Sequence, residues 1–286
     1  MKGYYYCSLD TFLNIVKRKE IYLSDPLKMN DSLEIKWYLE KLREQPEDRC
    51  LDEPFDSRIF EAMKSRSHID FNYEELIENI NSNGQRSAYI CCFSKRPDIL
   101  SQWRTYANDG CGVAIGFDLD KLKIADNFFV KTVKYTNEVC VRDDETDVEV
   151  VADSISIFIS EEKIIDKEEQ IRVFLHELIT VLVEYKNPAF KEEQEVRLIY
   201  CDDLKFEKLL NRIGAINENY IKLEHDFRTI SADDITEFVR MPFKEDVIRE
   251  IYIGPKCRLS ENDVTRILCK NNINNVSVKK SSASYR

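Results

Sequence analysis

Hydrophobic residues recur along the chain with the spacings of strands and amphipathic helices, separated by short polar turns. Residues 3–8 are aromatic and prone to form a strand, after which Ser8 or Asp10 can cap a helix. Residues 88–94 are almost entirely apolar, which is typical of a central strand covered on both faces. Further strands are predicted at 21–24, 113–117, 128–135, 195–200, 220–230, 237–241, 250–254 and 276–279, and helices from 34 and at 55–81, 99–107, 154–159, 168–185 and 260–269. Because the pattern shows no internal repeat and no linker, it predicts one α+β domain over residues 1–286, with a central mixed sheet flanked by helices.

Composition narrows the class of protein. The chain has 286 residues, a formal net charge of −11, 43% hydrophobic residues, and only 7 glycines and 7 prolines. Those values support a packed core and exclude a disordered or fibrous chain. The acidic excess repels phosphate backbones and anionic lipid, so a long nucleic acid is the less favourable partner. No apolar run approaches the roughly 18 residues of a membrane helix, and the first ten residues do not resemble a signal peptide, so we expect a cytoplasmic protein that does not associate with membranes.

Cysteine and histidine spacing gives no metal signature. The nine cysteines are scattered without a CxxC pair, and the three histidines lie far apart. Cysteines inside apolar segments are typical of reduced core thiols in a reducing compartment. We therefore expect neither a zinc site nor a structural disulfide.

Residues 191–200 (KEEQEVRLIY) carry the first candidate chemistry. Strand alternation would place Glu193, Glu195 and Arg197 on one side. One interpretation is an exposed strand edge with a Glu195–Arg197 ion pair, worth at most about 1 kcal/mol, in which case Glu195→Gln costs the fold little. The other is an enclosed cleft, where a carboxylate could hold a ribose hydroxyl and stabilise the oxocarbenium-like cation formed when a glycosidic bond breaks.

Residues 94–112 carry the second candidate. Trp103 could stack on a flat ring and Arg104 could contact a phosphate with two hydrogen bonds, as a nucleotide site requires. The alternative is that Trp103 and Tyr106 anchor the core while Arg104 is a surface cation. In the turn at 24–34, Asn30 and Asp31 fit an Asx turn and helix cap. The alternative is that Asp31 and Glu34, one helical turn apart, offer two acceptors to a ligand hydroxyl or a cation.

These segments occur in an order that resembles a known bacterial family. The motifs are an aromatic first strand, an Asn-Asp turn, a Phe-Ser strand end, a Trp-x-x-Tyr helix, a glycine-rich entry into a strand, an acid-x-Glu-x-Arg strand, an Ile-Gly-Pro strand end and a terminal serine near Tyr-Arg. In order, they are Tyr4–Ser8; Asn30, Asp31 and Glu34; Phe93 and Ser94; Trp103 and Tyr106; Gly110, Gly112 and Phe117; Glu193, Glu195 and Arg197; Ile253, Gly254 and Pro255; and Ser281, Tyr285 and Arg286. Together they resemble domain-of-unknown-function family 2971 (DUF2971) over nearly the whole chain. Ser32, where that family usually has proline, and the insertion at 207–219 depart from the pattern.

The motif order is also similar to the ADP-ribosyltransferase fold. Members of that class place a polar residue on the first strand, a Ser or Tyr after a middle strand, and a Glu, often as Glu-x-Glu, on a late strand. The resemblance implies NAD as a substrate, with Glu195 stabilising the cation and Glu193 orienting or deprotonating the acceptor. It implies eight residues that bind the dinucleotide: Tyr6, Ser8, Asn30, Asp31, Ser94, Trp103, Arg104 and Tyr106. The first strand departs from the class, because it has tyrosines where His or Arg is common.

This resemblance implies an enzyme that transfers or hydrolyses the ADP-ribosyl group of NAD, as the effector of an anti-phage or toxin–antitoxin system. Its partners would be NAD or a related nucleotide, an acceptor that is protein, nucleic acid or water, and a cognate antitoxin or defence-system partner. The alternative is a non-catalytic module that senses a nucleotide or binds a protein partner. Both interpretations require Ser94 and Glu195 to lie close together at the ends of central strands.

Overall fold

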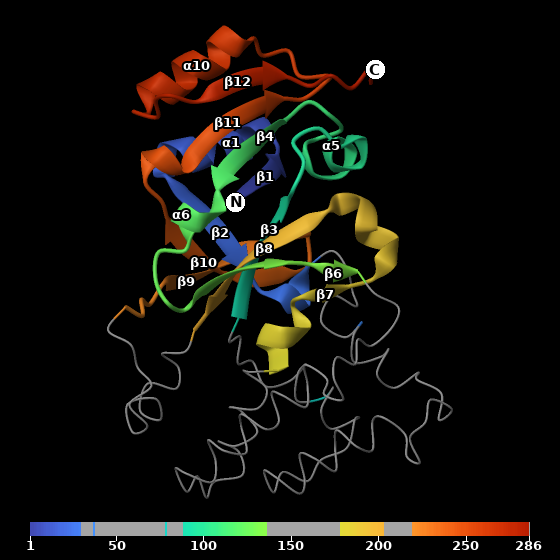
Figure 1. Ribbon diagram of the computed structural model, residues 1–286, viewed down its shortest axis with the longest axis vertical. Coiled ribbons are helices and arrows are strands. Elements are labelled where there is room, and N and C mark those ends of the chain that lie inside the picture. The colour runs from blue at the N-terminus through green and yellow to red at the C-terminus, as the bar shows by residue number, and fades with distance from the viewer. Residues whose placement is uncertain (30–36, 38–77, 79–87, 136–177, 203–218, 286) are drawn as a thin grey trace, which may run out of the picture.

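The computed structural model describes residues 1–29, 37, 78, 88–135, 178–202 and 219–285. Within these residues, ten strands form one sheet with the main order β12-β11-β4-β1-β3-β2-β10-β9, and β8 and β5 extend from β3 (Figure 1). Its strands are β1 (Lys2–Cys7), β2 (Glu20–Ser24), β3 (Ala88–Ser94), β4 (Val113–Asp118), β5 (Phe128–Thr132), β8 (Glu195–Cys201), β9 (Glu224–Thr229), β10 (Ile235–Pro242), β11 (Ile248–Ile253) and β12 (Ser277–Lys280). The β11–β12 pair is parallel and the other pairs are antiparallel, so the predicted α+β fold with a central mixed sheet is confirmed.

Helices and a small second sheet accompany the main sheet. The helical segments are α1 (Leu9–Arg18), η1 (Pro26–Lys28), α5 (Leu100–Tyr106), α6 (Leu119–Leu122), η2 (Pro188–Glu193), η4 (Glu245–Val247) and α10 (Glu261–Lys270), where η denotes a 3-10 helix. The second sheet pairs β6 (Lys134–Tyr135) with β7 (Tyr185–Lys186). Among the described residues, no helix is long and apolar enough to span a membrane.

The sheet splits at β3. Along one edge, β3 pairs with β8 over its whole length, and Ser94 lies opposite Glu195. Along the other edge, β3 meets β1 at the Tyr4–Ser94 pair and β2 at the Ser24–Ile90 pair. The central position of residues 88–94 and 195–200, and the approach of Ser94 to Glu195, are therefore confirmed. Because β1 and β2 meet β3 near opposite ends, they diverge from each other between these two points.

Helix α1 shows how local sequence fixes the entry to β2. The Ser8 hydroxyl caps the helix by accepting a hydrogen bond from the Thr11 N–H, and Lys19 ends it in the left-handed region with a φ of 55°. The helix packs against β2 and β4. Its buried residues recur at helical spacing: Phe12, Ile15 and Val16.

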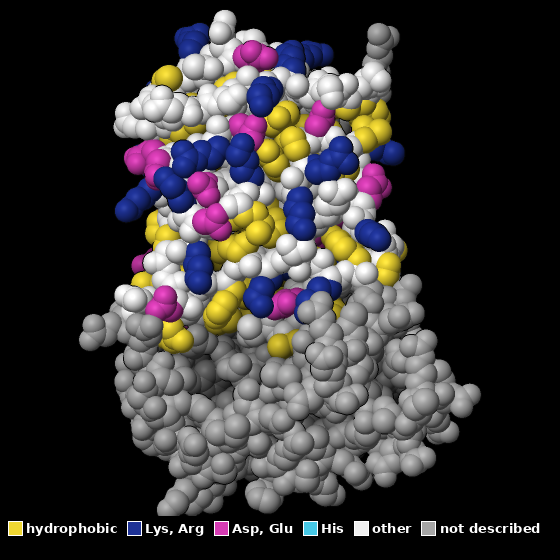
Figure 2. All heavy atoms as spheres, viewed as in Figure 1, with side chains coloured by type: hydrophobic (Ala, Val, Ile, Leu, Met, Phe, Trp, Pro, Cys, Tyr) yellow, Lys and Arg dark blue, Asp and Glu magenta, His cyan; other side chains and the backbone are white. Residues whose placement is uncertain are grey.

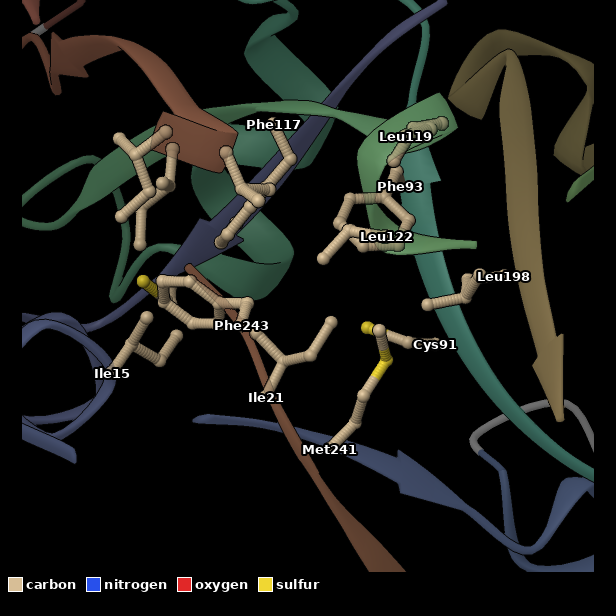
Figure 3. Close-up of a cluster of buried hydrophobic side chains, with 14 of the residues drawn as sticks. Ile15, Ile21, Cys91, Phe93, Phe117, Leu119, Leu122, Leu198, Met241 and Phe243 are labelled. Atoms are coloured by element: carbon tan, nitrogen blue, oxygen red, sulfur yellow. The ribbon is translucent and has the colours of Figure 1, made fainter. Parts of the chain in front are cut away.

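One face of the sheet holds the main hydrophobic core. Side chains from α1, β2, β3, β8 and β10 point toward one another there, among them Ile15, Ile21, Cys91, Leu198 and Met241 (Figure 3). Burying such a side chain stabilises the fold by about 1.5–3 kcal/mol. The opposite face of β1 carries Tyr4 and Tyr6, which pack with α5. The sheet therefore has one face that holds the main core and a second face on which α5 packs against β1.

Two glycines allow strand β4 to start beside β1. A Cβ at Gly112 would lie 2.0 Å from the Cys7 carbonyl oxygen, which no side chain could tolerate. Gly110 has a φ of +84°, a conformation that glycine adopts without strain. The glycine-rich segment before β4 is thus a requirement of close backbone packing.

The structure shortens some predicted elements. Of the predicted helix at 168–185, residues 168–177 lie outside the described residues, 178–182 are helical, and Tyr185 lies in β7, where it pairs with Lys134. The predicted strand at 220–230 starts at Glu224. The helix after Ser260 is confirmed, with a complete capping box between Ser260 and Asp263. Four further predicted features lie outside the described residues apart from positions 37, 78 and 219. They are the helices from 34, at 55–81 and at 154–159, and the insertion at 207–219.

Candidate functional site

A cleft of about 950 Å³ opens where β1 and β2 diverge over β3. It is lined by residues of β1, β2, β3, α1, α5 and η2, and by the segment that joins β9 to β10. Helix α5 packs against both β1 and η2, so it forms one wall. The first residue of β8, Glu195, also lines the cleft. A cavity of this size at the branch of a sheet is a suitable place for a small-molecule ligand.

Glu195 is held by two cations. Its Oε1 accepts a hydrogen bond from Arg197 Nε at 2.6 Å, and its Oε2 accepts one from Lys186 Nζ at 2.8 Å. Glu195 is 3% exposed and Arg197 is fully buried, with its Nη1 donating to the Val183 carbonyl oxygen at 2.5 Å. The Glu195–Arg197 ion pair therefore exists, but the expectation of an exposed strand edge is wrong, because β8 is covered on both faces and lies between β3 and β5.

Glu193 reaches the same place by a different route. Strand alternation does not apply to it, because it ends η2 and the next residue, Gln194, turns the chain in the left-handed region with a φ of 46°. Its Oε2 nevertheless accepts a hydrogen bond from Lys186 Nζ at 2.7 Å, and its Oε1 accepts one from the Tyr106 hydroxyl at 3.0 Å. The two carboxylates thus converge on Lys186 rather than on one strand face.

Electrostatics keeps Glu195 ionised. Burial alone would raise the pKa of Glu195, but the charges of Arg197 and Lys186 outweigh it and lower the pKa to about 2. The Cys92 thiol adds a hydrogen bond to the same carboxylate. Burial and the neighbouring Glu193 raise the pKa of Tyr106, so its hydroxyl remains a hydrogen-bond donor at neutral pH. Burial likewise raises the pKa of Tyr135, whose hydroxyl accepts the Glu195 N–H, to about 12.

Trp103 and Arg104 do not face the cleft. Trp103 is fully buried, its ring packs edge-on against Tyr6 with 4.8 Å between centroids, and its Nε1 donates to Asp98 at 2.6 Å. Arg104 is exposed and lies near the Tyr285 ring. The core interpretation of Trp103 is therefore correct, and of the three residues proposed on this helix, Tyr106 alone lines the cleft.

The remaining predicted residues divide between the cleft and local structure. Tyr6 lines the cleft, and its hydroxyl donates to the Arg96 carbonyl and accepts from the Ile99 N–H. Ser8 caps α1, and the buried Ser94 hydroxyl accepts from the Arg96 N–H at 3.2 Å. Both serines thus have structural roles here. Asn30 and Asp31 lie outside the described residues.

Several residues of the cleft were not predicted from the sequence. Lys186 lies in a segment predicted to follow a long helix, and Arg18 and Arg228 come from segments far apart in the chain. Cys92 had a usable signal, because strand alternation places it on the same face of β3 as Ser94. No spacing rule indicates the other three.

Comparison with known proteins supports the family resemblance. A family model described as "Protein of unknown function (DUF2971)" matches residues 102–198, a stretch that contains Trp103, Tyr106, Glu193, Glu195 and Arg197. The resemblance to family 2971 is confirmed over this stretch. Neither a curated protein nor a solved structure matches the chain. The family description assigns no function, so function must be argued from the cleft.

Proposed function

We propose that the cleft binds NAD or a related nucleotide and that the protein transfers or hydrolyses its ADP-ribosyl group. The observation that carries the proposal is the convergence of Glu193 and Glu195 on one wall of the cleft, with Glu195 ionised. A fixed negative charge in a water-poor site stabilises a cation that develops in the transition state. Breaking a glycosidic bond produces such a cation on the ribose.

Glu195 retains capacity to act on a ribose. An ionised carboxylate offers about four lone-pair positions, and Arg197, Lys186 and Cys92 account for three of them. We assign the remaining position to a ribose hydroxyl. The C–N bond to nicotinamide breaks, its electron pair leaves with nicotinamide, and the charge left on the ribose lies near Glu195. An acceptor hydroxyl or water then attacks the ribose and transfers its proton to Glu193, which the Tyr106 hydroxyl orients.

A second candidate function rests on the same cluster. Both oxygens of Glu195 are taken up by cations, so Glu193, Glu195, Lys186 and Arg197 together carry no net charge. Such a neutral cluster also fits a rigid wall that holds a nucleotide without reacting with it. This alternative is a sensing or partner-binding module, and it requires the shape of the cleft but not the charge of Glu195.

Nicotinamide release separates the two candidates. Purified full-length protein is incubated with NAD, alone and with cell extract, and nicotinamide and ADP-ribose are quantified chromatographically. Release of nicotinamide that is lost in Glu195→Gln supports the enzyme, and free ADP-ribose distinguishes hydrolysis from transfer. NAD binding without any nicotinamide release supports the sensing module.

The cellular role is part of the proposal. An ADP-ribosyl-transferring enzyme acting inside a cytoplasm would consume NAD or modify an acceptor, which suits the effector of an anti-phage or toxin–antitoxin system with a neutralising partner. Induced expression of the parent should then arrest growth, and expression of Glu195→Gln at an equal level should not. Equal growth of both cultures would contradict the effector role.

A further inference from the structure

Two arginines contact neighbouring positions on the cleft face of β2. Arg18 Nη1 donates to the Tyr22 hydroxyl at 3.0 Å, and Arg228 Nη2 donates to the Ser24 hydroxyl at 2.8 Å. All four residues line the cleft. Tyr22 and Ser24 are two positions apart on one strand, which separates them by about 7 Å and points them to the same face. The fold thus brings guanidinium groups from α1 and β9 to one short stretch of strand.

These arginines differ from the other cations of the cleft. Among the described residues that line it, Lys28 is paired with Asp234 at 2.8 Å, and Lys186 is paired with Glu193 and Glu195. Arg18 and Arg228 have hydroxyl partners instead, which are neutral and use one of the five N–H donors of each guanidinium. Both arginines are exposed to the cleft, so charge and donors remain available for a ligand.

The positive charge of Arg228 also acts on Tyr5 and Cys91, two further residues that line the cleft. Burial raises the pKa of Tyr5 and of Cys91, and in both cases the positive charge of Arg228 opposes that rise. Because the protein carries a net charge of −11, an anionic ligand is repelled from most of its surface. Within the described part of the chain, no ion pair is formed by Arg18 or Arg228, so these two arginines are the feature that would draw such a ligand into the cleft.

We propose that Arg18 and Arg228 form a subsite for the diphosphate of the nucleotide. Arginine binds phosphate oxygens with paired hydrogen bonds, and guanidinium groups that contact two neighbouring positions of one strand could each contact one phosphate of a diphosphate. Ser24 lies opposite Ile90 and Glu195 lies opposite Ser94, so β3 separates the two subsites by about 13 Å along its length. The diphosphate on β2 would direct the nicotinamide ribose toward Glu195. The choice of NAD as ligand rests on the proposed function, whereas diphosphate binding does not.

Calorimetric titration with ADP-ribose tests the subsite without requiring turnover. The parent should bind ADP-ribose, and Arg18→Gln and Arg228→Gln should each weaken binding by about tenfold to hundredfold, since a hydrogen bond to a charged group contributes about 1.5–3 kcal/mol. Arg249→Gln is the matched control, because Arg249 is an exposed arginine paired with Asp118 and does not line the cleft. Inorganic pyrophosphate should compete with ADP-ribose for the parent.

The outcomes separate this inference from the proposed function. Equal affinity for ADP-ribose in the parent and the double arginine variant, absence of binding by the parent, or failure of pyrophosphate to compete would each overturn the subsite. Arginine-dependent binding of ADP-ribose without NAD turnover would support the subsite and remove the enzyme. NAD turnover that persists in the double variant with an unchanged KM would support the enzyme and remove the subsite.

Discussion

Glu195 and Glu250 are two buried glutamates of the same sheet that look alike in their immediate surroundings. Glu250, on β11, is 5% exposed and accepts hydrogen bonds from Lys2, Lys279 and the Tyr4 hydroxyl. Burial would raise its pKa, but these partners together lower it, as they do for Glu195. A Cβ added at Gly116 would lie 2.7 Å from Glu250 Cγ, so the Glu250 side chain fits at this position because residue 116 is glycine.

The two glutamates differ in what surrounds their cations. The side chains of Lys2 and Lys279 are 57% and 51% exposed, so solvent screens their charges and can replace them. The side chains of Lys186 and Arg197 are 7% and 0% exposed, so at Glu195 the protein alone supplies the compensation. Glu195 also lines the cleft, and Glu250 does not. A buried, ionised glutamate is therefore insufficient evidence of function, and the position in a cleft is what distinguishes the candidate.

Exposed charged side chains of both signs also occur outside the two glutamate clusters. Figure 2 shows lysine, arginine, aspartate and glutamate side chains mixed with apolar ones over this face of the described residues. Exposed pairs of this kind, such as Arg249 with Asp118, contribute little to stability because solvent competes for each partner. The ion pairs of Glu195 differ from these because both of their cations are buried.

Removing one lysine from each cluster should give the largest contrast. Lys186→Met leaves Glu193 and Glu195 facing each other without the cation between them, which should cost about 3–5 kcal/mol of unfolding free energy. Lys279→Met should change stability very little, because Lys2 stays on Glu250 and water replaces the lost amine. Urea unfolding of both variants and the parent at pH 7 measures the difference.

A change of pH provides the control for that prediction. If carboxylate repulsion destabilises Lys186→Met, protonating one carboxylate should relieve it, so the deficit relative to the parent should shrink at about pH 4. Equal losses in Lys186→Met and Lys279→Met would show that burial of the cations does not distinguish the clusters.

The rate of nicotinamide release should distinguish Glu195 from Glu250 almost as strongly as stability distinguishes Lys186 from Lys279. Glu195→Gln keeps the size of the side chain but removes the charge, so nicotinamide release should fall by about 10²–10³-fold, or roughly 3–4 kcal/mol in the barrier. Glu250→Gln removes an equally buried charge outside the cleft and should leave the rate within about threefold of the parent, because it changes no interaction made only in the transition state. Melting temperatures of both variants establish that folded proteins are compared. Equal rates for the two variants would remove Glu195 from the mechanism.

The dependence of the unfolding free energy on pH should show how much stability each ionised glutamate contributes. Lowering the pKa of Glu195 from 4.5 to about 2 corresponds to about 3 kcal/mol of folding stability. Because the folded-state pKa is depressed, this stability is complete above about pH 5 and is lost as the pH falls toward 2. The difference in unfolding free energy between the parent and Glu195→Gln should therefore narrow over that range, and the difference for Glu250→Gln should be smaller throughout. Urea unfolding at intervals between pH 3 and pH 7 tests this, and a constant difference for Glu195→Gln would contradict it.

The central features of the fold follow from local patterns that the sequence displays directly. The near-continuous apolar character of residues 88–94 and 195–200 predicts central strands, and the serines before α1 and α10 predict their starts. Apolar runs and capping serines predict these elements well because each pattern involves only residues that are close together in the sequence. The apposition of Ser94 and Glu195 follows once the two strands pair in the antiparallel sense.

The site was less predictable because its geometry depends on contacts between distant segments. A single left-handed residue, Gln194, moves Glu193 off the strand, and non-glycine residues rarely take that conformation, so alternation gives no warning. The short helix α5 carries polar and aromatic residues on all sides, which leaves the direction of Trp103 undetermined until β1 packs against it. The convergence of Arg18 and Arg228 on β2 requires the whole sheet order.

The smallest contrast concerns two tyrosine hydroxyls that each donate to a glutamate. The Tyr106 hydroxyl donates to Glu193 at 3.0 Å, and the Tyr4 hydroxyl donates to Glu250 at 2.8 Å. Replacing either tyrosine with phenylalanine should cost about 1 kcal/mol of stability, the net contribution of a typical hydrogen bond. In Tyr106→Phe, Glu193 loses the group that orients it as the proton acceptor, so kcat for nicotinamide release should fall by about fivefold, a change of about 1 kcal/mol, with little change in KM. Tyr4→Phe should lose as much stability as Tyr106→Phe but keep the kcat of the parent, because the Tyr4 hydroxyl donates to Glu250 and not to Glu193. If both variants lost activity equally, the tyrosines would act through the shape of the cleft that both of them line, and the orienting role of Tyr106 would be wrong.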